Sequence, residues 1–160
     1  MTSQNPPPPL DLDELLVGQR FASSSITLTA EAISAFAREF DPQPFHISEE
    51  SARQTFFGRL AASGWHTAAL TMRLNVEGGL PIAGGLIGAG GDIAWPTALH
   101  AGDTIHVESE VVAVTPSRSR PDRGIVTIVS RTLNQDGAAV QVATMKLLVF
   151  RRARTPDTGR

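Results

Sequence analysis

Three long runs of residues that favour β-strands lie in the C-terminal part of the chain, and they constrain the fold more than any other feature. The runs are rich in β-branched residues, as strands are, and they occupy residues 105–114, 124–133 and 138–150. The first run begins with alternating apolar and polar residues, which predicts a strand with one buried face. The sequence NQDG at 134–137 predicts a tight turn, so the last two runs should form a hairpin.

A single strongly apolar helix is predicted over residues 65–76, ending at Gly78 and Gly79. Its apolar residues do not keep to one narrow face, and a helix of that kind is normally buried. Two more strands are predicted near 21–28 and 86–95, so the sheet should have about five strands. One antiparallel sheet and one buried helix fit together best when the sheet curls around the helix. The sequence therefore predicts an α+β fold.

Two shorter helices are predicted before the apolar one. An amphipathic pattern with the i, i+3, i+4, i+7 spacing is formed by Ile33, Phe36, Ala37 and Phe40. Thr29 is the expected N-cap of this helix, which should stop at Phe40 because a proline follows at position 42. Ser48 is the expected N-cap of the second helix, with two glutamates after it that favour its positive end.

Two prolines separate an aspartate from a histidine in FDPQPFH, residues 40–46. Each proline disfavours the α region for the residue before it, so Asp41 and Gln43 should be extended. In one interpretation the stretch ends a helix, with Asp41 as a turn residue and His46 placed before the Ser48 cap. In the other it holds Asp41 and His46 as a preorganised catalytic pair. Spacing alone does not choose between them.

The composition limits the classes of function. A chain of 160 residues fits one domain, and a formal net charge of -2 argues against nucleic acid or acidic lipid as the main partner. There is no cysteine, no apolar run long enough for a membrane span and no signal-peptide pattern, so we expect a cytoplasmic protein. We expect a disordered proline-rich arm at residues 1–9, the folded domain at 10–150 and a solvated basic tail at 151–160.

Several common site motifs are absent from the sequence. Seven glycines lie between Gly78 and Gly91, but they match neither phosphate-binding glycine motif, and they indicate a loop and a strand close to another backbone. No metal site is expected, because metal-ligand spacing is missing among His46, His66, His100 and His106. The arginines of RSRPDR (118–123) indicate a solvated loop; alternatively, some contact the phosphates of a cofactor-bearing substrate.

The stretch FDPQPFHISEESA resembles the hydratase signature of the MaoC-like dehydratases, a family that includes the (R)-specific enoyl-CoA hydratases. That signature runs Asp, any residue, Asn, Pro, an aliphatic residue, His, and a small residue six positions on. The matching residues are Asp41, Pro44, His46 and Ala52. The chain departs from the signature at Gln43, in place of Asn, and at Phe45, in place of the aliphatic residue.

Two further segments extend the resemblance to about residues 18–150. Gly64 stands where the family begins its central helix, although the usual histidine before it is Ser63. The segment WPTALHAGDTIHV (95–107) is similar to the family's P-x-x-x-G-D-T approach to a strand. The resemblance implies the hotdog fold, a curved antiparallel sheet wrapped around one apolar helix, which agrees with the fold predicted from the strand and helix patterns.

The resemblance also implies a reaction, the addition of water to a trans-2-enoyl thioester. Asp41 would act as general base while His46 orients the water and shares the return of the proton. The backbone N–H of Gly64, at a helix N-terminus, would stabilise the enolate oxygen. Supporting contacts to the pair are expected from Gln43, Pro44 and Ser63. An acyl tunnel would be lined by Phe56, Phe57, Trp65 and Leu70.

The expected partners follow from the same resemblance. The substrate would be an acyl-CoA, straight, branched or carboxylated, and no separate cofactor is expected. The tunnel would lie at the interface of a homodimer. Two alternatives stay open: a hotdog thioesterase, against which the absence of an acidic residue in 65–76 counts, and a non-catalytic acyl-CoA-binding protein, against which Asp41 and His46 count.

Overall fold

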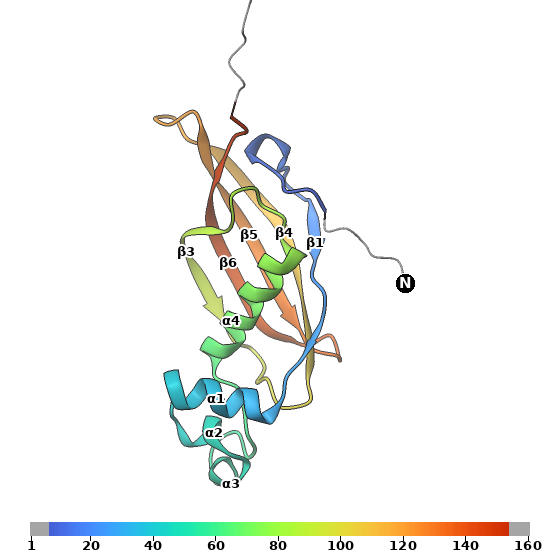
Figure 1. The fold of residues 1–160 in the computed structure, drawn as a ribbon, viewed down its shortest axis with the longest axis vertical. Helices are drawn as coiled ribbons and strands as arrows, with labels where there is room; N and C mark the ends of the chain where they lie inside the picture. Colours follow the sequence, from blue (N-terminus) through green and yellow to red (C-terminus); the bar gives the residue numbers. More distant parts are fainter. Residues whose placement is uncertain (1–6, 154–160) are drawn as a thin grey trace, which may run out of the picture.

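The structure, a computed structural model, describes residues 7–153 and consists of one curved antiparallel sheet around a central helix (Figure 1). The strands are β1 (Arg20–Ala22), β2 (Ile26–Thr27), β3 (Ile87–Ala94), β4 (Thr104–Pro116), β5 (Arg123–Leu133) and β6 (Ala139–Phe150). The helices are η1 (Leu12–Glu14), α1 (Ala30–Phe40), α2 (Pro44–Ile47), α3 (Glu49–Ala52), α4 (Gly64–Leu74) and the π-helical η2 (Asn75–Gly79). The α+β fold predicted from the sequence is confirmed.

The sheet has 6 strands in the order β1-β4-β5-β6-β3, with β2 also paired to β4. The sequence patterns predicted about five, because the run at 21–28 was taken as one strand. In the structure Ser23 interrupts it: the Ser23 side-chain oxygen, rather than a backbone carbonyl, accepts from the Val107 N–H at 2.8 Å. The hairpin between β5 and β6 is confirmed, with the Asn134 N–H bonded to the Ala138 carbonyl at 2.9 Å.

The apolar interior forms two clusters on the concave side of the sheet. One packs under α4 and includes Leu70, Leu74, Ile105 and Val107. The other packs under the N-terminal segment and includes Leu12, Leu15, Val111 and Val126. Between them on β4 and β5 lies the buried pair Ser109 and Ser130, whose hydroxyl oxygens are 2.7 Å apart. Each hydroxyl satisfies the other, so this polar layer is accommodated inside the fold.

The central helix is confirmed, but its complete burial is not. α4 begins at Gly64 and gives way after Leu74 to η2, where Gly78 takes a positive φ of 134° that favours glycine. The sheet covers only one side of α4, and Trp65, Met72 and Val76 are 61%, 45% and 64% exposed. The prediction that the helix is buried all round is therefore wrong for the single chain.

The helices before α4 form as the caps and prolines require. The Thr29 hydroxyl accepts from the Ala32 N–H, and Ser48 caps α3 by accepting from the Ser51 N–H at 3.1 Å. α1 ends at Phe40 and Gln43 is extended, as predicted, but Asp41, with φ -154° and ψ 68°, leaves the helix without becoming extended. α2, which the sequence patterns do not predict, starts at Pro44, a position where the missing proline N–H costs nothing.

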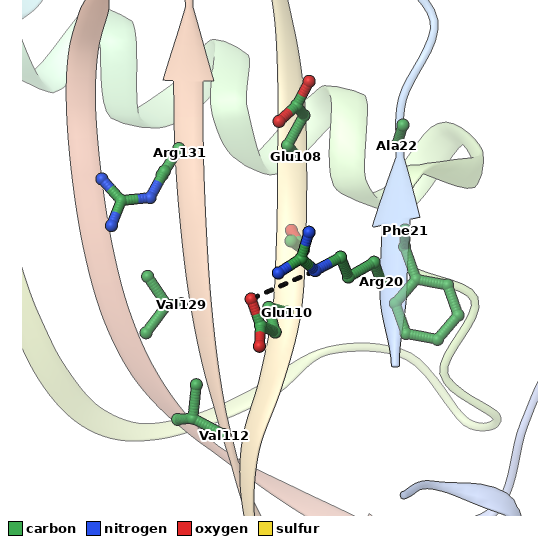
Figure 2. Close-up of a pocket in the computed structure, with 9 residues that line it drawn as sticks. Arg20, Phe21, Ala22, Glu108, Glu110, Val112, Val129 and Arg131 are labelled. Atoms are coloured by element: carbon green, nitrogen blue, oxygen red, sulfur yellow. Dashed lines mark ion pairs between the residues drawn. The ribbon is translucent and has the colours of Figure 1, made fainter. Parts of the chain in front are cut away.

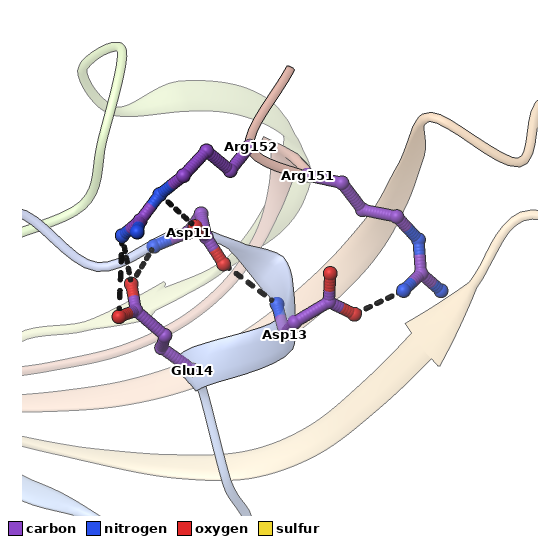
Figure 3. Close-up of polar contacts among 5 residues, drawn as sticks. All are labelled: Asp11, Asp13, Glu14, Arg151 and Arg152. Carbon is purple, nitrogen blue, oxygen red and sulfur yellow. Dashed lines mark hydrogen bonds and ion pairs between the residues drawn. The ribbon is translucent and has the colours of Figure 1, made fainter. Parts of the chain in front are cut away.

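The two ends of the described chain contact each other at one end of the sheet (Figure 3). Arg151 pairs with Asp13, and Arg152 pairs with Asp11 at 3.1 Å and with Glu14 at 3.3 Å. Ordered contacts thus continue two residues past Phe150, while 1–6 and 154–160, most of the predicted arm and tail, lie outside the described residues. No helix within residues 7–153 is long and apolar enough to cross a membrane.

Candidate active site

Asp41 and His46 converge at the end of α4 that carries its N-terminus. Asp41 caps the C-terminal end of α1, and His46 lies in the single turn of α2. His46 Nε2 is 3.4 Å from Asp41 Oδ2, and the two side chains are only 7% and 16% exposed. Pro42 and Pro44 fix the path of the four residues between them, so the two groups face each other across a short rigid turn.

The imidazole of His46 is held in one tautomer. Its Nδ1 lies 2.6 Å from the Ala61 carbonyl oxygen, and a carbonyl can only accept, so Nδ1 carries the proton. The same segment is anchored by the Ala61 N–H, which donates to the Phe45 carbonyl at 3.0 Å. In the neutral ring Nε2 is then an acceptor, and it faces the carboxylate of Asp41, which is also an acceptor.

Two side chains donate hydrogen bonds to the Asp41 carboxylate. Gln43 Nε2 donates to Oδ1 and the Ser63 hydroxyl donates to Oδ2, each at 2.7 Å. Burial by itself raises the pKa of Asp41, but the hydrogen bonds from Ser63 and Gln43 and the nearby His46 outweigh it, and the pKa lies below its usual value. The carboxylate is therefore ionised at neutral pH, as a general base must be.

The N-terminus of α4 lies directly beside this carboxylate. Ser63 is the N-cap, and its hydroxyl oxygen accepts from the Trp65 N–H at 3.2 Å. Gly64 follows as the first helical residue, where backbone N–H groups have no partner within the helix and carry the positive end of its dipole. The arrangement offers a base, a fixed imidazole acceptor and a positively polarised helix end within one small region.

Gly64 also has a steric reason to lack a side chain. A Cβ at this position would lie 2.7 Å from the Trp95 indole, a distance that real Cβ atoms do not show. Trp95 donates through Nε1 to Gln141 Oε1 at 2.9 Å and meets Trp65 edge to face, with ring centroids 5.3 Å apart. Sequence reasoning did not assign Trp95 or Gln141 to the site, and only Trp95 carried a signal, through the segment 95–107.

The four residues predicted to line an acyl tunnel are not brought together in the single chain. Phe57 lies near Phe45 and His46 with its ring tilted to both, and Phe56 beside it is 96% exposed. Leu70 belongs to the apolar core under α4, and Trp65 lies on the exposed side of that helix. Of the predicted supporting residues, Gln43 and Ser63 contact Asp41, while Pro44 acts through the backbone as the first residue of α2.

The other histidines lie apart from this pair. His66 is buried and stacks on Phe36 with ring centroids 4.6 Å apart, and burial lowers its pKa. His100 Nδ1 lies 2.7 Å from the Leu60 carbonyl oxygen. His106 is 3.2 Å from Glu108 on the convex face of the sheet. In the loop with the arginines, Arg123 pairs with Asp122 at 2.8 Å, which agrees with a solvated loop.

A pocket of about 490 Å³ lies away from the candidate site, on the convex face of the sheet. Figure 2 shows its floor on β4, with β1 and β5 at its sides and α4 behind the sheet. Arg20 pairs with Glu110 across it at 3.4 Å. Its lining residues are Arg20, Phe21, Ala22, Glu108, Ser109, Glu110, Val112, Val129 and Arg131. None of the predicted site residues is among them.

The curved sheet around α4, with an aspartate and a histidine held over the helix N-terminus, defines a hotdog domain of the hydratase and dehydratase class. The chain belongs to the MaoC-like dehydratase family: the sequence model of the MaoC like domain matches residues 15–133. This confirms the resemblance drawn from the motif FDPQPFH.

Individual relatives support the family assignment. A MaoC-like dehydratase from Rhodospirillum rubrum has 59% sequence identity and a TM-score of 0.89, over 91% of this chain and 99% of that one. The (R)-hydratase from A. caviae involved in PHA biosynthesis has 29% identity and a TM-score of 0.66, over 86% of this chain and 98% of that one. The uncharacterized protein YdeM of Bacillus subtilis (strain 168) is 32% identical over 145 residues, 89% of this chain and 100% of YdeM.

Proposed function

We propose that this protein catalyses the reversible addition of water to a trans-2-enoyl-CoA, with Asp41 and His46 as the catalytic pair. The observation that carries the proposal is the position of His46 Nε2, an acceptor in the neutral ring, 3.4 Å from Asp41 Oδ2. Two acceptors do not bond to each other, but one water can donate a hydrogen to each. The oxygen of that water keeps a lone pair for attack on the β carbon.

The proposed reaction balances as a simple addition. Asp41 takes a proton from the bound water while the water oxygen bonds to the β carbon. The electron pair of the double bond moves toward the thioester carbonyl. The proton then returns to the α carbon, shared between Asp41 and His46. The reverse sequence removes water from a 3-hydroxyacyl thioester, so the same pair of residues serves both directions.

Charge that develops on the thioester oxygen needs a stabilising group. The Gly64 N–H at the start of α4 is the proposed donor. It belongs to the first turn, where N–H groups have no acceptor within the helix, and it lies at the positive end of the helix dipole. Ser63 joins this helix end to the Asp41 carboxylate through one hydroxyl. Ser63, which holds the base, is therefore the residue directly before Gly64, the proposed donor to the thioester carbonyl.

We also propose that the site is completed in a homodimer. The side of α4 away from the sheet presents an exposed apolar stripe at i, i+4 and i+7, formed by Trp65, Ala69 and Met72, and Val76 of η2 extends it. Beside it, every residue of the edge strand β3 is exposed. An uncovered strand edge and an apolar stripe together favour association. A second copy would cover both and supply the remaining wall of an acyl tunnel that includes Trp65, Phe56 and Phe57.

The test follows crotonyl-CoA with the purified protein, recording the enoyl-thioester absorbance and free thiol in parallel. Loss of absorbance without thiol release is the expected result and indicates hydration. Thiol release would show thioester hydrolysis instead. Neither change, repeated with branched and carboxylated enoyl-CoA esters, would contradict the proposed reaction and favour a binding protein.

A further inference from the structure

Ser63 occupies a position that the known motif does not explain. Its side chain is buried, with 1% exposure, and its hydroxyl oxygen lies 2.7 Å from Asp41 Oδ2 and 3.2 Å from the Trp65 nitrogen. The serine is 22 residues away from Asp41 in the sequence. Where the family usually has a histidine before its central helix, this chain brings a small hydroxyl group against the proposed base.

The direction of both hydrogen bonds follows from the chemistry of the partners. The Trp65 N–H can only donate, and an ionised carboxylate can only accept. The single hydroxyl proton of Ser63 must therefore point to Asp41, while its lone pair receives the Trp65 N–H. This chain of two bonds ties the position of Oδ2 to the first turn of α4. A hydroxyl that only capped the helix would leave its proton free to point elsewhere.

Gln43 completes the restraint from the other side. Its amide donates to Asp41 Oδ1 at 2.7 Å, so both carboxylate oxygens receive a hydrogen bond and the plane of the carboxylate is fixed. Oδ2, the oxygen bonded to Ser63, is also the one that faces His46 Nε2. Gln43 and Ser63, two of the positions at which the chain departs from the usual residues of the family, thus act on the same carboxylate.

We propose that Ser63 is a positioning residue that aligns the Asp41 base with the carbonyl-binding end of α4. This inference rests on the proposed hydration, in which Asp41 Oδ2 accepts the proton of the water. A bond that moves with α4 keeps the base in register with the thioester carbonyl. Small losses of alignment reduce the rate of a reaction between preorganised groups severely.

The principal test compares Ser63→Ala with the wild type in kcat, KM and pH profile. Losing the hydroxyl should lower kcat by about tenfold or more at neutral pH, with KM changed less, since in this proposal Ser63 acts through Asp41 and not on the substrate. The acid limb of the kcat profile should move to higher pH, because a hydrogen bond to the charged form holds the pKa of Asp41 down. Ser63→Thr, which keeps the hydroxyl, should restore both properties in part.

A matched control separates the effect of losing the helix cap from the effect of losing the contact with Asp41. Thr29 caps α1 through its side chain, and α1 has the same length as α4, 11 residues. Thr29→Ala should lower the melting temperature while leaving the pH profile of kcat unchanged. If Ser63→Ala does not fold, Ser63→Cys is used, because it keeps the volume and weakens both hydrogen bonds, and the chain has no other cysteine.

A second readout does not depend on catalysis. Titration of the Asp41 carboxyl by carbon-13 NMR should give a higher pKa in the serine variant than in the wild type. If the wild type hydrates no enoyl-CoA but this shift is seen, the proposed function fails while the Ser63 contact stands. An unchanged Asp41 titration together with a wild-type kcat profile, in whichever variant folds, would overturn the proposal.

Discussion

At the residue scale, the candidate site is built from acceptors and donors whose roles are fixed by geometry. His46 cannot rotate freely, since its Nδ1–H is bound to the Ala61 carbonyl. Asp41 cannot turn its carboxylate, because Gln43 and Ser63 hold one oxygen each. His46 Nε2 and Asp41 Oδ2 are 3.4 Å apart, so the proposed water would lie to one side of the pair and donate one hydrogen to each. Preorganisation of this kind reduces the rearrangement needed during the reaction.

Changing either member of the pair should remove most of the activity without unfolding the protein. Asp41→Asn keeps the shape but removes the base, and His46→Ala removes the acceptor that orients water. General acid and base groups contribute about 100-fold to 10,000-fold in rate, so each change should lower kcat by at least about 100-fold. The losses should be far from additive in the double variant, since both act on one water. A folded single variant with near-normal kcat on an accepted enoyl-CoA would refute the assignment.

The carboxylate of Asp41 should also make stability depend on pH. Its pKa in the folded protein is below the ordinary value, so ionised Asp41 stabilises the folded state above the unfolded pKa, and this contribution is lost as pH falls through the folded pKa. Between about pH 6 and about pH 3.5, the wild type should lose more free energy of unfolding than Asp41→Asn. Urea denaturation at several pH values measures the difference. Equal losses in both proteins would mean that the pKa is not lowered by folding.

At the element scale, the sequence predicted each long strand, α1 and the central helix, because each has a strong local pattern. It did not predict α2, a single turn set by Pro44, nor the interruption of the first strand at Ser23, which depends on a side chain replacing a backbone acceptor. The contact of Gly64 with Trp95 was also beyond prediction, and that of Asp41 with Ser63 was expected only through the family resemblance. Both join segments far apart in the sequence, whose meeting depends on how α4 lies on the sheet.

The close contact between α4 and Trp95 predicts the effect of a small substitution. Gly64→Ala at the start of a helix would ordinarily be tolerated or favourable. Here the new Cβ would meet the Trp95 ring at 2.7 Å, and overpacking of this kind costs about 1–3 kcal/mol. Chemical denaturation should show that loss, and Trp95→Leu in the same chain should recover part of it. Full stability of Gly64→Ala with Trp95 present would show that the ring moves aside freely.

At the scale of the whole molecule, the two edges of the sheet differ. One edge carries the short β1, which covers β4 together with β2. The other is β3, an exposed strand of eight residues whose end points toward the N-terminal end of α4 (Figure 1). The apolar residues of α4 were read from the sequence as buried on all sides. The prediction and the structure agree if a second copy covers the stripe. Residues buried between subunits are apolar in the sequence, just as residues buried inside one chain are.

A charge placed in the stripe should therefore separate the subunits. Val76 is 64% exposed in the single chain, so Val76→Lys should leave the subunit folded, but a buried lysine in a dimer interface is costly. Val17 is 65% exposed and lies just before Gly18, whose N–H donates to β4 at the opposite edge of the sheet, which makes Val17→Lys the matched control. Light scattering at micromolar concentration should find a dimer for the wild type and Val17→Lys and a monomer for Val76→Lys. Because each proposed acyl tunnel needs the partner subunit, the monomer should also lose hydration activity. A fully active wild-type monomer would contradict both the dimer and the shared tunnel.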